Sequence, residues 1–162
     1  MKDFVPAHSP QLDRHAYQLS HLIASFNVSL MRNLYREFDG DLVQIIVLGE
    51  ISMRNVDQFF RKGGADVPEK LLDDVQRRGQ LLQACNVLSI SESTGIPRET
   101  VRRKVAQLIE KGWIYRDERK RVFVRPGVGE RFVRANAKTA GDILELAAKI
   151  QSLLKPPDTE HD

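Results

Sequence analysis

Basic side chains gather in one stretch of the chain, from Gly95 to Arg125. This stretch holds ten Lys or Arg against four Asp or Glu, a net charge of +6. The whole chain of 162 residues carries only +3, so the remainder carries −3. Lys and Arg bind phosphate oxygens, and arginine also donates two hydrogen bonds to guanine O6 and N7. This uneven charge indicates a polyanion-binding surface, although a solvated charged surface has the same composition.

The basic stretch begins with the pattern of an amphipathic helix over 97–112. Four apolar residues recur at i, i+4, i+7 and i+8 and predict one buried stripe: Val101, Val105, Leu108 and Ile109. Pro97 suits the first helical position, where its missing N–H has no helical partner to lose. Gly112 suits the C-terminal end.

Seven residues of this helix are candidates for contact with nucleic acid: Pro97, Arg98, Glu99, Thr100, Arg102, Arg103 and Gln107. With Val101 at the centre of the buried side, we expect Glu99, Arg103 and Gln107 to project outward and Arg102 to flank them. Glutamate can accept a hydrogen bond from cytosine N4, and glutamine can pair with adenine. Threonine hydroxyls mostly hold phosphates. These residue types suit a helix that enters the major groove of DNA.

A shorter helix is predicted directly before it, over 87–94. Asn86 can cap its N-terminus by accepting an N–H of the first turn. Gly95 can end it, because glycine readily takes the left-handed conformation of a sharp turn. Ile96 is expected to point back into the angle between the two helices. A short helix, a glycine turn and a longer helix make a helix-turn-helix.

A β-hairpin is predicted to follow, with strands over 113–115 and 122–124 and a charged turn over 116–121. Four basic residues lie in that turn: Arg116, Arg119, Lys120 and Arg121. A hairpin directly after a helix-turn-helix is the plan of a winged helix. The four cations would then meet the phosphate backbone or the minor groove, whereas in an ordinary hairpin they would only be solvated.

The residues from Cys85 to Val124 resemble the helix-turn-helix core of bacterial winged-helix transcription regulators. The pattern "TGIPRETVRRKV…L.EKGWI" is shared by several of their families, including the MarR and GntR types. Long predicted helices on both sides are similar to the dimerisation helices of MarR-type proteins. The resemblance implies a MarR-like transcriptional regulator that binds double-stranded DNA.

Those flanking helices carry the predicted dimer interface. The stretch 8–40 predicts one long helix, capped by Ser9, whose apolar residues follow a heptad spacing. Near the C-terminus another apolar stripe predicts a helix broken or bent near Gly141. Eight residues are the candidates for dimerisation: Leu12, Leu19, Ile23, Phe26, Leu30, Ile143, Leu146 and Ile150. Packing against a second copy is the natural way to bury the N-terminal stripe, and packing within the chain would also serve.

The predicted fold is mainly α with a small β-hairpin wing, a winged helix-turn-helix flanked by long dimerisation helices. We expect an N-terminal dimerisation helix over 1–40, a DNA-binding domain over 41–125, a C-terminal dimerisation helix over 126–155 and a disordered tail over 156–162. Within the DNA-binding domain, a largely buried helix is predicted over 41–60. Another is predicted from Pro68 to a point near Cys85.

Several other features exclude functions. Cys85 is the only cysteine, so the chain has no internal disulfide and no cysteine-based metal cluster, and we expect a buried thiol rather than a redox sensor. The four histidines lack the spacing of a metal site: His8, His15, His21 and His161. Glu37, Asp39 and Asp41 cluster where two helices meet, which favours helix starts over a metal loop.

Neither an enzyme nor a membrane protein is expected. We find no phosphate loop, nucleophile elbow, zinc helix or other cofactor motif, and no apolar run that could span a bilayer. Because no secretory signal is evident either, we expect a cytoplasmic protein. The predicted function is a homodimeric regulator that binds a short palindromic operator. The alternative is a winged-helix protein–protein interaction module within a complex. A small-molecule effector is compatible with the first prediction.

Overall fold

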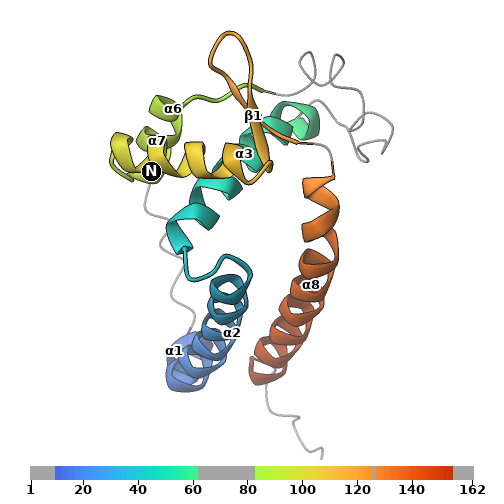
Figure 1. Cartoon of the computed structure of the whole chain (residues 1–162). Helices are drawn as coiled ribbons and strands as arrows, with labels where there is room; N and C mark the ends of the chain where they lie inside the picture. The colour runs from blue at the N-terminus through green and yellow to red at the C-terminus, as the bar shows by residue number, and fades with distance from the viewer. Residues whose placement is uncertain (1–9, 62–82, 126, 155–162) are drawn as a thin grey trace, which may run out of the picture. The chain divides into compact units, whose positions relative to one another are not determined.

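The computed structural model of the chain describes residues 10–61, 83–125 and 127–154. Its elements follow in the order α1 (Pro10–Arg14), α2 (Ala16–Glu37), α3 (Leu42–Arg61), α6 (Val87–Thr94), α7 (Arg98–Glu110), β1 (Ile114–Arg116), β2 (Val122–Val124) and α8 (Val128–Leu153) (Figure 1). The fold is mainly helical, with one small two-stranded antiparallel sheet over the described ranges. No described helix is both long and apolar enough to cross a membrane.

The chain divides into two compact units. Unit 1 combines Met1–Asn33 with Arg134–Asp162, and unit 2 is Leu34–Val133. Unit 1 therefore contains α1 and most of α2 and α8. Unit 2 contains α3, α6, α7 and the β1–β2 hairpin.

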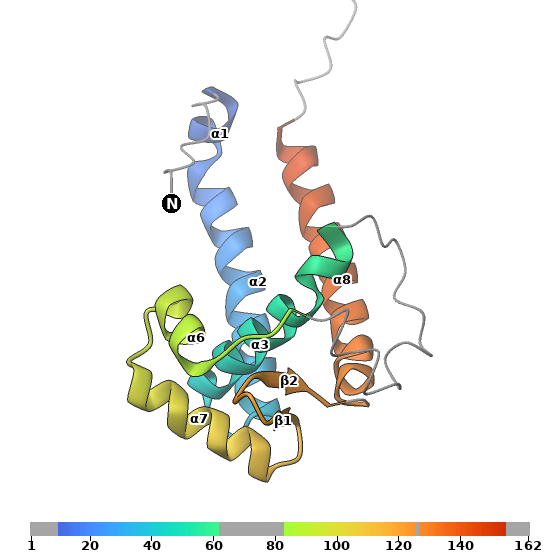
Figure 2. The same ribbon diagram turned by 90° about the horizontal axis from the view of Figure 1, so that it is seen from above.

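Unit 2 has a well-defined apolar core. In Figure 2, α6, α7 and the hairpin are gathered around α3. Val47, Leu48 and Ile51 recur at helical spacing on α3, and each is at most 5% exposed. Side chains from every element of the unit complete the cluster: Phe38, Cys85, Ile90, Val101, Val105, Leu108, Ile114 and Val122. The stripe predicted for α7 is therefore confirmed, with Ile109 only partly buried at its edge.

Two of the predicted helices differ from the structure. The single helix expected over 8–40 is two helices, which separate at His15. Its ring Nδ1 lies 3.0 Å from Gln18 Oε1, and its carbonyl accepts the Leu19 N–H at the start of α2. The C-terminal helix, predicted to be broken or bent near Gly141, is one continuous helix through that residue, so it is not broken there.

The helix predicted from Pro68 is wrong at its C-terminal end. Cys85 forms an antiparallel bridge with Val122, and Gln83 and Ala84 are not helical. The part of that prediction over 68–82 lies outside the described residues, as do the cap at Ser9 and the tail over 156–162. The first strand is Ile114–Arg116, one residue later than predicted, and Ile114 pairs with Val124.

Candidate nucleic-acid interface

The start of α6 and the turn after it form as the sequence predicts. Asn86 Oδ1 accepts the Ser89 N–H at 3.0 Å, and Ser89 Oγ accepts the Asn86 N–H at 3.1 Å, which makes a reciprocal capping box. Gly95 has φ 70° and donates its N–H to the Ser91 carbonyl. Glycine takes this left-handed conformation without the penalty that a Cβ brings. The sharp turn into α7 is therefore set by Gly95.

Polar contacts fasten α6 to α3. Glu50 Oε1 accepts hydrogen bonds from Arg54 Nε at 2.5 Å and from Ser93 Oγ at 2.6 Å. Arg54 Nη2 also lies 3.4 Å from the Ser89 carbonyl, to which it donates. Burial raises the pKa of Glu50, but the bonds from Ser93 and Arg54 and the Arg54 charge outweigh it and hold the pKa below its ordinary value. The ionised carboxylate thus holds the first of the two helices in place.

Two of the ten basic residues bond to residues at the start of α3, and of these two Lys104 is half-buried and Lys111 is exposed. Lys104 Nζ lies 2.5 Å from Asp41 Oδ2, and Lys111 Nζ donates to Gln44 Oε1 at 2.9 Å. Asp41 Oδ1 also accepts the Gln44 N–H and so caps α3. Burial raises the pKa of Asp41, but its bonds to Lys104 and to the Gln44 N–H, with the charges of Lys104 and Lys111, bring it below the ordinary value.

The outer side of α7 exposes four of the candidate residues: Arg98, Glu99, Arg102 and Arg103. Glu99 and Arg102 form a bidentate pair, with Nη2–Oε1 at 2.6 Å and Nε–Oε2 at 2.8 Å. The hydrogen bond and charge of Arg102 hold the pKa of Glu99 below its ordinary value. Arg98 and Arg103 are also exposed, so their charge faces solvent.

Gln107 does not project outward as expected. Its side chain is half-buried, and its Oε1 is buried with no hydrogen-bond partner among the described residues. The position lies one turn before Lys111, close to the side of α7 that packs on α3. Thr100 is also half-buried, whereas Pro97 is exposed at the N-terminus of α7. Base reading by Gln107 therefore has no support in the structure.

The turn of the hairpin presents its cations in a fixed geometry. Asp117 accepts the Lys120 N–H at 3.0 Å, and Lys120 takes the left-handed conformation with φ 59°, the geometry of a three-residue hairpin loop. Arg121 is half-buried: its Nε donates to Asp117 Oδ2 at 2.6 Å, and its guanidinium lies 5.6 Å from the centre of the Phe123 ring. The other three predicted cations of this turn are exposed: Arg116, Arg119 and Lys120.

The hairpin is anchored to α3 by a side chain that the sequence analysis missed. Asn55 is 2% exposed, donates to the Gln83 and Val122 carbonyls and accepts the Val124 N–H at 2.9 Å. A buried amide needs such partners, and here it ties β2 to the helix. The available signal was a polar residue four positions after Ile51, on a face that is otherwise apolar.

Cys85 also belongs to this support. Its carbonyl accepts the Val122 N–H at 2.8 Å, and its thiol is buried, with a pKa that burial raises to about 11. A thiol that stays protonated is a poor redox sensor, so the prediction of a buried core cysteine is confirmed. No group of three or more His, Cys, Asp or Glu side chains in the described ranges could hold a metal ion. Asp41, from the acidic cluster considered for a metal, instead caps α3.

The residues predicted for dimerisation fall into two sets in unit 1. Leu19 is buried, and five others are half-buried: Leu12, Phe26, Leu30, Leu146 and Ile150. Ile23 and Ile143 are exposed, at 45% and 48%. The heptad pattern thus combined residues from two sides of the helices.

No protein-family model, curated protein or solved structure matches the chain. The function must therefore be argued from the residues of unit 2 and their geometry.

Proposed function

We propose that unit 2 is a winged helix that binds double-stranded DNA, and that the chain is a homodimeric transcriptional regulator acting on a short palindromic operator. The observation that carries this proposal is the outer side of α7, where Arg98, Arg102 and Arg103 are exposed while Lys104 is turned inward onto Asp41. The capped α6 and the left-handed turn at Gly95 precede it, as in a helix-turn-helix.

In this proposal α7 enters the major groove. Arg98, Arg102 and Arg103 contact guanine edges or phosphates, and a well-placed bidentate pair is worth about 1–3 kcal/mol of discrimination against the wrong base. Glu99 holds Arg102 in the free protein, so one of the two must change partner, or both must turn together, when a base is read.

The hairpin supplies the second set of contacts. Arg121 is already oriented by Asp117 and Phe123, so it loses little side-chain freedom on meeting a phosphate. Arg116, Arg119 and Lys120 are exposed and add charge at the same turn. Phosphate contacts of this kind fix the position of a protein on the duplex, and α7 would supply the sequence preference.

A second candidate function, a protein–protein interaction module, is favoured by one observation. Leu42, Ile46 and Met53 are 41%, 50% and 62% exposed and recur at helical spacing along α3. Such a stripe suits a protein partner better than DNA. The two candidate functions depend on different residues. DNA binding needs α7 and the hairpin, whereas binding of a protein partner would need the exposed stripe of α3.

The experiment is a salt titration of binding by the purified full-length chain to the DNA upstream of its own gene. We expect log K to fall steeply with log salt, with roughly one unit of slope per phosphate neutralised. The double variant Arg102→Ala/Arg103→Ala should lower the slope and lose the preference for this DNA over random DNA. The matched control, Arg32→Ala/Lys138→Ala, removes two cations from unit 1 and should leave both quantities unchanged.

The result that contradicts the proposal is weak binding that the α7 variant does not alter. A loss of binding that is equal in both double variants would indicate only a general charge effect. In either case, Ile46→Asp on α3 would then test the interaction module by its effect on protein partners.

A further inference from the structure

Glu99 and Arg102 are bonded to each other in one particular geometry on the outer side of α7. The guanidinium of Arg102 meets the carboxylate through its Nε and Nη2 atoms, at 2.8 Å and 2.6 Å. Both side chains are largely exposed, at 61% for Arg102 and 75% for Glu99. In this side-on arrangement, two parallel bonds fix the plane of the guanidinium.

The side-on arrangement leaves Arg102 a second pair of donors. A guanidinium carries five N–H groups, one on Nε and two on each Nη. The bonds to Glu99 take the Nε–H and one N–H of Nη2, and they leave the other N–H of Nη2 and both of Nη1. At the end of the side chain, one N–H of Nη1 and one of Nη2 point the same way. Two parallel donors of this kind are what guanine O6 and N7 accept in the major groove.

The pair lies in the part of α7 that a recognition helix brings to the bases. Glu99 is the second residue of the helix and Arg102 the fifth, so both belong to its first two turns. The other side of α7 is fixed on the core of unit 2 by three fully buried residues: Val101, Val105 and Leu108. Because this packing sets the rotation of the helix, it also sets the direction in which the pair faces.

The pair has no net charge, which distinguishes it from its neighbours. Arg98 and Arg103 are exposed on the same helix, and each brings a full positive charge. Such charges are attracted to phosphates and give binding that does not depend on sequence. The charge of Arg102 is balanced by Glu99, so its hydrogen bonds decide where it binds. The bond from Arg102 lowers the pKa of Glu99, which keeps the carboxylate ionised at neutral pH.

We infer that Arg102 reads a guanine while it stays bonded to Glu99, and that Glu99 is the residue that positions it. The inference rests on the proposed function and deepens it, because it names the base and the side chain that sets the preference. Guanine O6 and N7 replace water at the end of the guanidinium, and the two side chains turn together without breaking their bonds. Each half of the proposed operator then carries one guanine opposite the start of α7.

Glu99 increases the preference for guanine in two ways. It holds the guanidinium in one orientation, so that Arg102 loses little side-chain freedom on binding. It also repels phosphate oxygens, so that Arg102 gains less from moving to the DNA backbone. The same negative charge lowers the affinity for DNA of any sequence. Removal of Glu99 is therefore expected to raise affinity and to lower selectivity.

Selection by the full-length chain from a pool of DNA duplexes with a randomised core tests the inference. The wild type should enrich one guanine in each half-site. Replacing that guanine by 7-deazaguanine removes the N7 acceptor and should weaken binding at least about fivefold. Arg102→Lys keeps the charge and loses the parallel donors, so it should keep the salt slope and no longer enrich this guanine.

Glu99→Ala tests whether the carboxylate positions Arg102 or blocks it. We expect this variant to bind random duplexes at least about threefold more tightly, because a negative charge is removed, and to prefer guanine at least about threefold less than the wild type. The matched control is Glu110→Ala, which removes the same charge from an exposed position at the C-terminal end of α7. Its preference for guanine should stay within about twofold of the wild type, because Glu110 lies far from the groove-facing turns.

Three results would overturn the inference. If Glu99→Ala bound guanine-containing and random duplexes more tightly by the same factor, Glu99 would only block Arg102. If it changed neither quantity, the carboxylate would serve only the start of the helix, where a negative charge is favourable. If Arg102→Lys still enriched the guanine, the parallel donors would not be its reader. Exposed ion pairs contribute little to stability, so the unfolding transition followed by Trp113 should be the same for all variants.

The selection also separates this inference from the proposed function. A chain that enriches no sequence would remove the proposed regulator, and the inference with it. A different result would be a chain that enriches a sequence, loses it in Arg102→Ala/Arg103→Ala and binds equally well to duplexes with 7-deazaguanine. That chain would keep the DNA-binding role and overturn only the reading of guanine by the pair.

Discussion

The two units of this chain contrast in how their helices are held. In unit 2, α3, α6, α7 and the hairpin share one buried cluster, and Asn55 and Glu50 add hydrogen bonds between the elements. In unit 1, two longer helices leave Ile23, Met31 and Leu144 exposed. The difference indicates that unit 2 is stabilised by its own core, whereas the described helices of unit 1 leave part of their apolar surface exposed within the single chain.

The largest expected effect comes from a cavity in unit 2. Leu108 is fully buried, so Leu108→Ala should lower the free energy of unfolding by about 3–4 kcal/mol. Leu30, half-buried in unit 1, should lose only about 1 kcal/mol on substitution by alanine at low protein concentration, because less apolar surface is removed. Urea unfolding followed by fluorescence of Trp113, the only tryptophan, reports on unit 2.

Protein concentration sharpens this test. The Trp113 transition of the wild type should not move with concentration, whereas the far-ultraviolet circular dichroism of the long helices should show greater stability at higher concentration. Equal losses for Leu108→Ala and Leu30→Ala at low concentration would show that the contrast between the units is wrong.

The next effect concerns the attachment of the hairpin. Asn55→Ala removes both donors and the acceptor of the buried amide, and it leaves the Val122 carbonyl and the Val124 N–H without their side-chain partner. We expect a loss of about 2–3 kcal/mol. The comparison variant is Asn86→Ala, which removes an exposed helix cap and should cost about 1 kcal/mol. If Asn55→Ala proved no more harmful than Asn86→Ala, the amide would not be the anchor of the sheet.

Acid tests the ion pair beneath α7. The folded-state pKa of Asp41 lies below its ordinary value of 3.8, so the pair with Lys104 stabilises the protein above that value and is lost as the pH falls through the folded-state pKa. Asp41→Asn keeps an acceptor for the Gln44 N–H and removes the charge. We expect it to be about 1 kcal/mol less stable than the wild type at pH 7 and to approach it below about pH 3.8. If Asp41→Asn were less stable than the wild type by the same amount at low pH as at pH 7, the loss of the ion pair would not be the cause of the difference.

The helix cap, the turn and the buried stripe of unit 2 could be predicted because each depends on residues close together in the sequence. Asn86 and Ser89 are three residues apart, Gly95 meets a backbone need of its own turn, and Val101 and Val105 share one side of one helix. What could not be predicted depends on distant residues. Lys104 is turned inward by Asp41, 63 positions away, and Asn55 bonds to residues 28 to 69 positions away. Gln107 was misplaced for the same reason, since packing on α3 decides its orientation.

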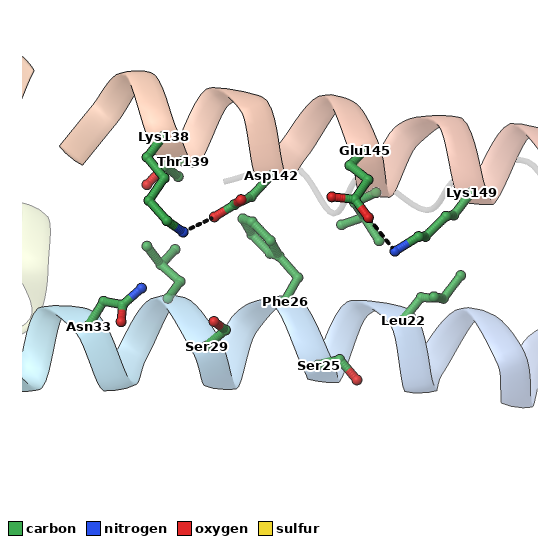
Figure 3. A pocket seen from close by; sticks show the side chains of 12 residues that line it. Leu22, Ser25, Phe26, Ser29, Asn33, Lys138, Thr139, Asp142, Glu145 and Lys149 are labelled. Carbon is green, nitrogen blue, oxygen red and sulfur yellow. Dashed lines mark hydrogen bonds and ion pairs between the residues drawn. The ribbon is translucent and has the colours of Figure 1, made fainter. Parts of the chain in front are cut away.

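The pattern in unit 1 is ambiguous for a different reason. A heptad spacing identifies a side of a helix that packs, but it does not say whether the partner lies in the same chain. Phe26 and Ile23 follow one spacing, yet Phe26 lines the groove to α8 and Ile23 is exposed. Only the position of the second helix separates the residues that line this groove (Figure 3) from those that are exposed.

The smallest expected effect comes from substitutions of Lys120 at the turn of the hairpin. They distinguish the role of its charge from that of its backbone conformation. Lys120 has φ 59°, which side chains with a Cβ adopt at some strain. Lys120→Gly should therefore stabilise unit 2 by about 0.5–1 kcal/mol, and Lys120→Ala should bring no such gain. Both variants lose the same charge, so both should lower the salt slope of DNA binding by about one unit if Lys120 contacts a phosphate. A lower slope for only one variant would show that turn geometry, and not the ammonium group, is what the DNA senses.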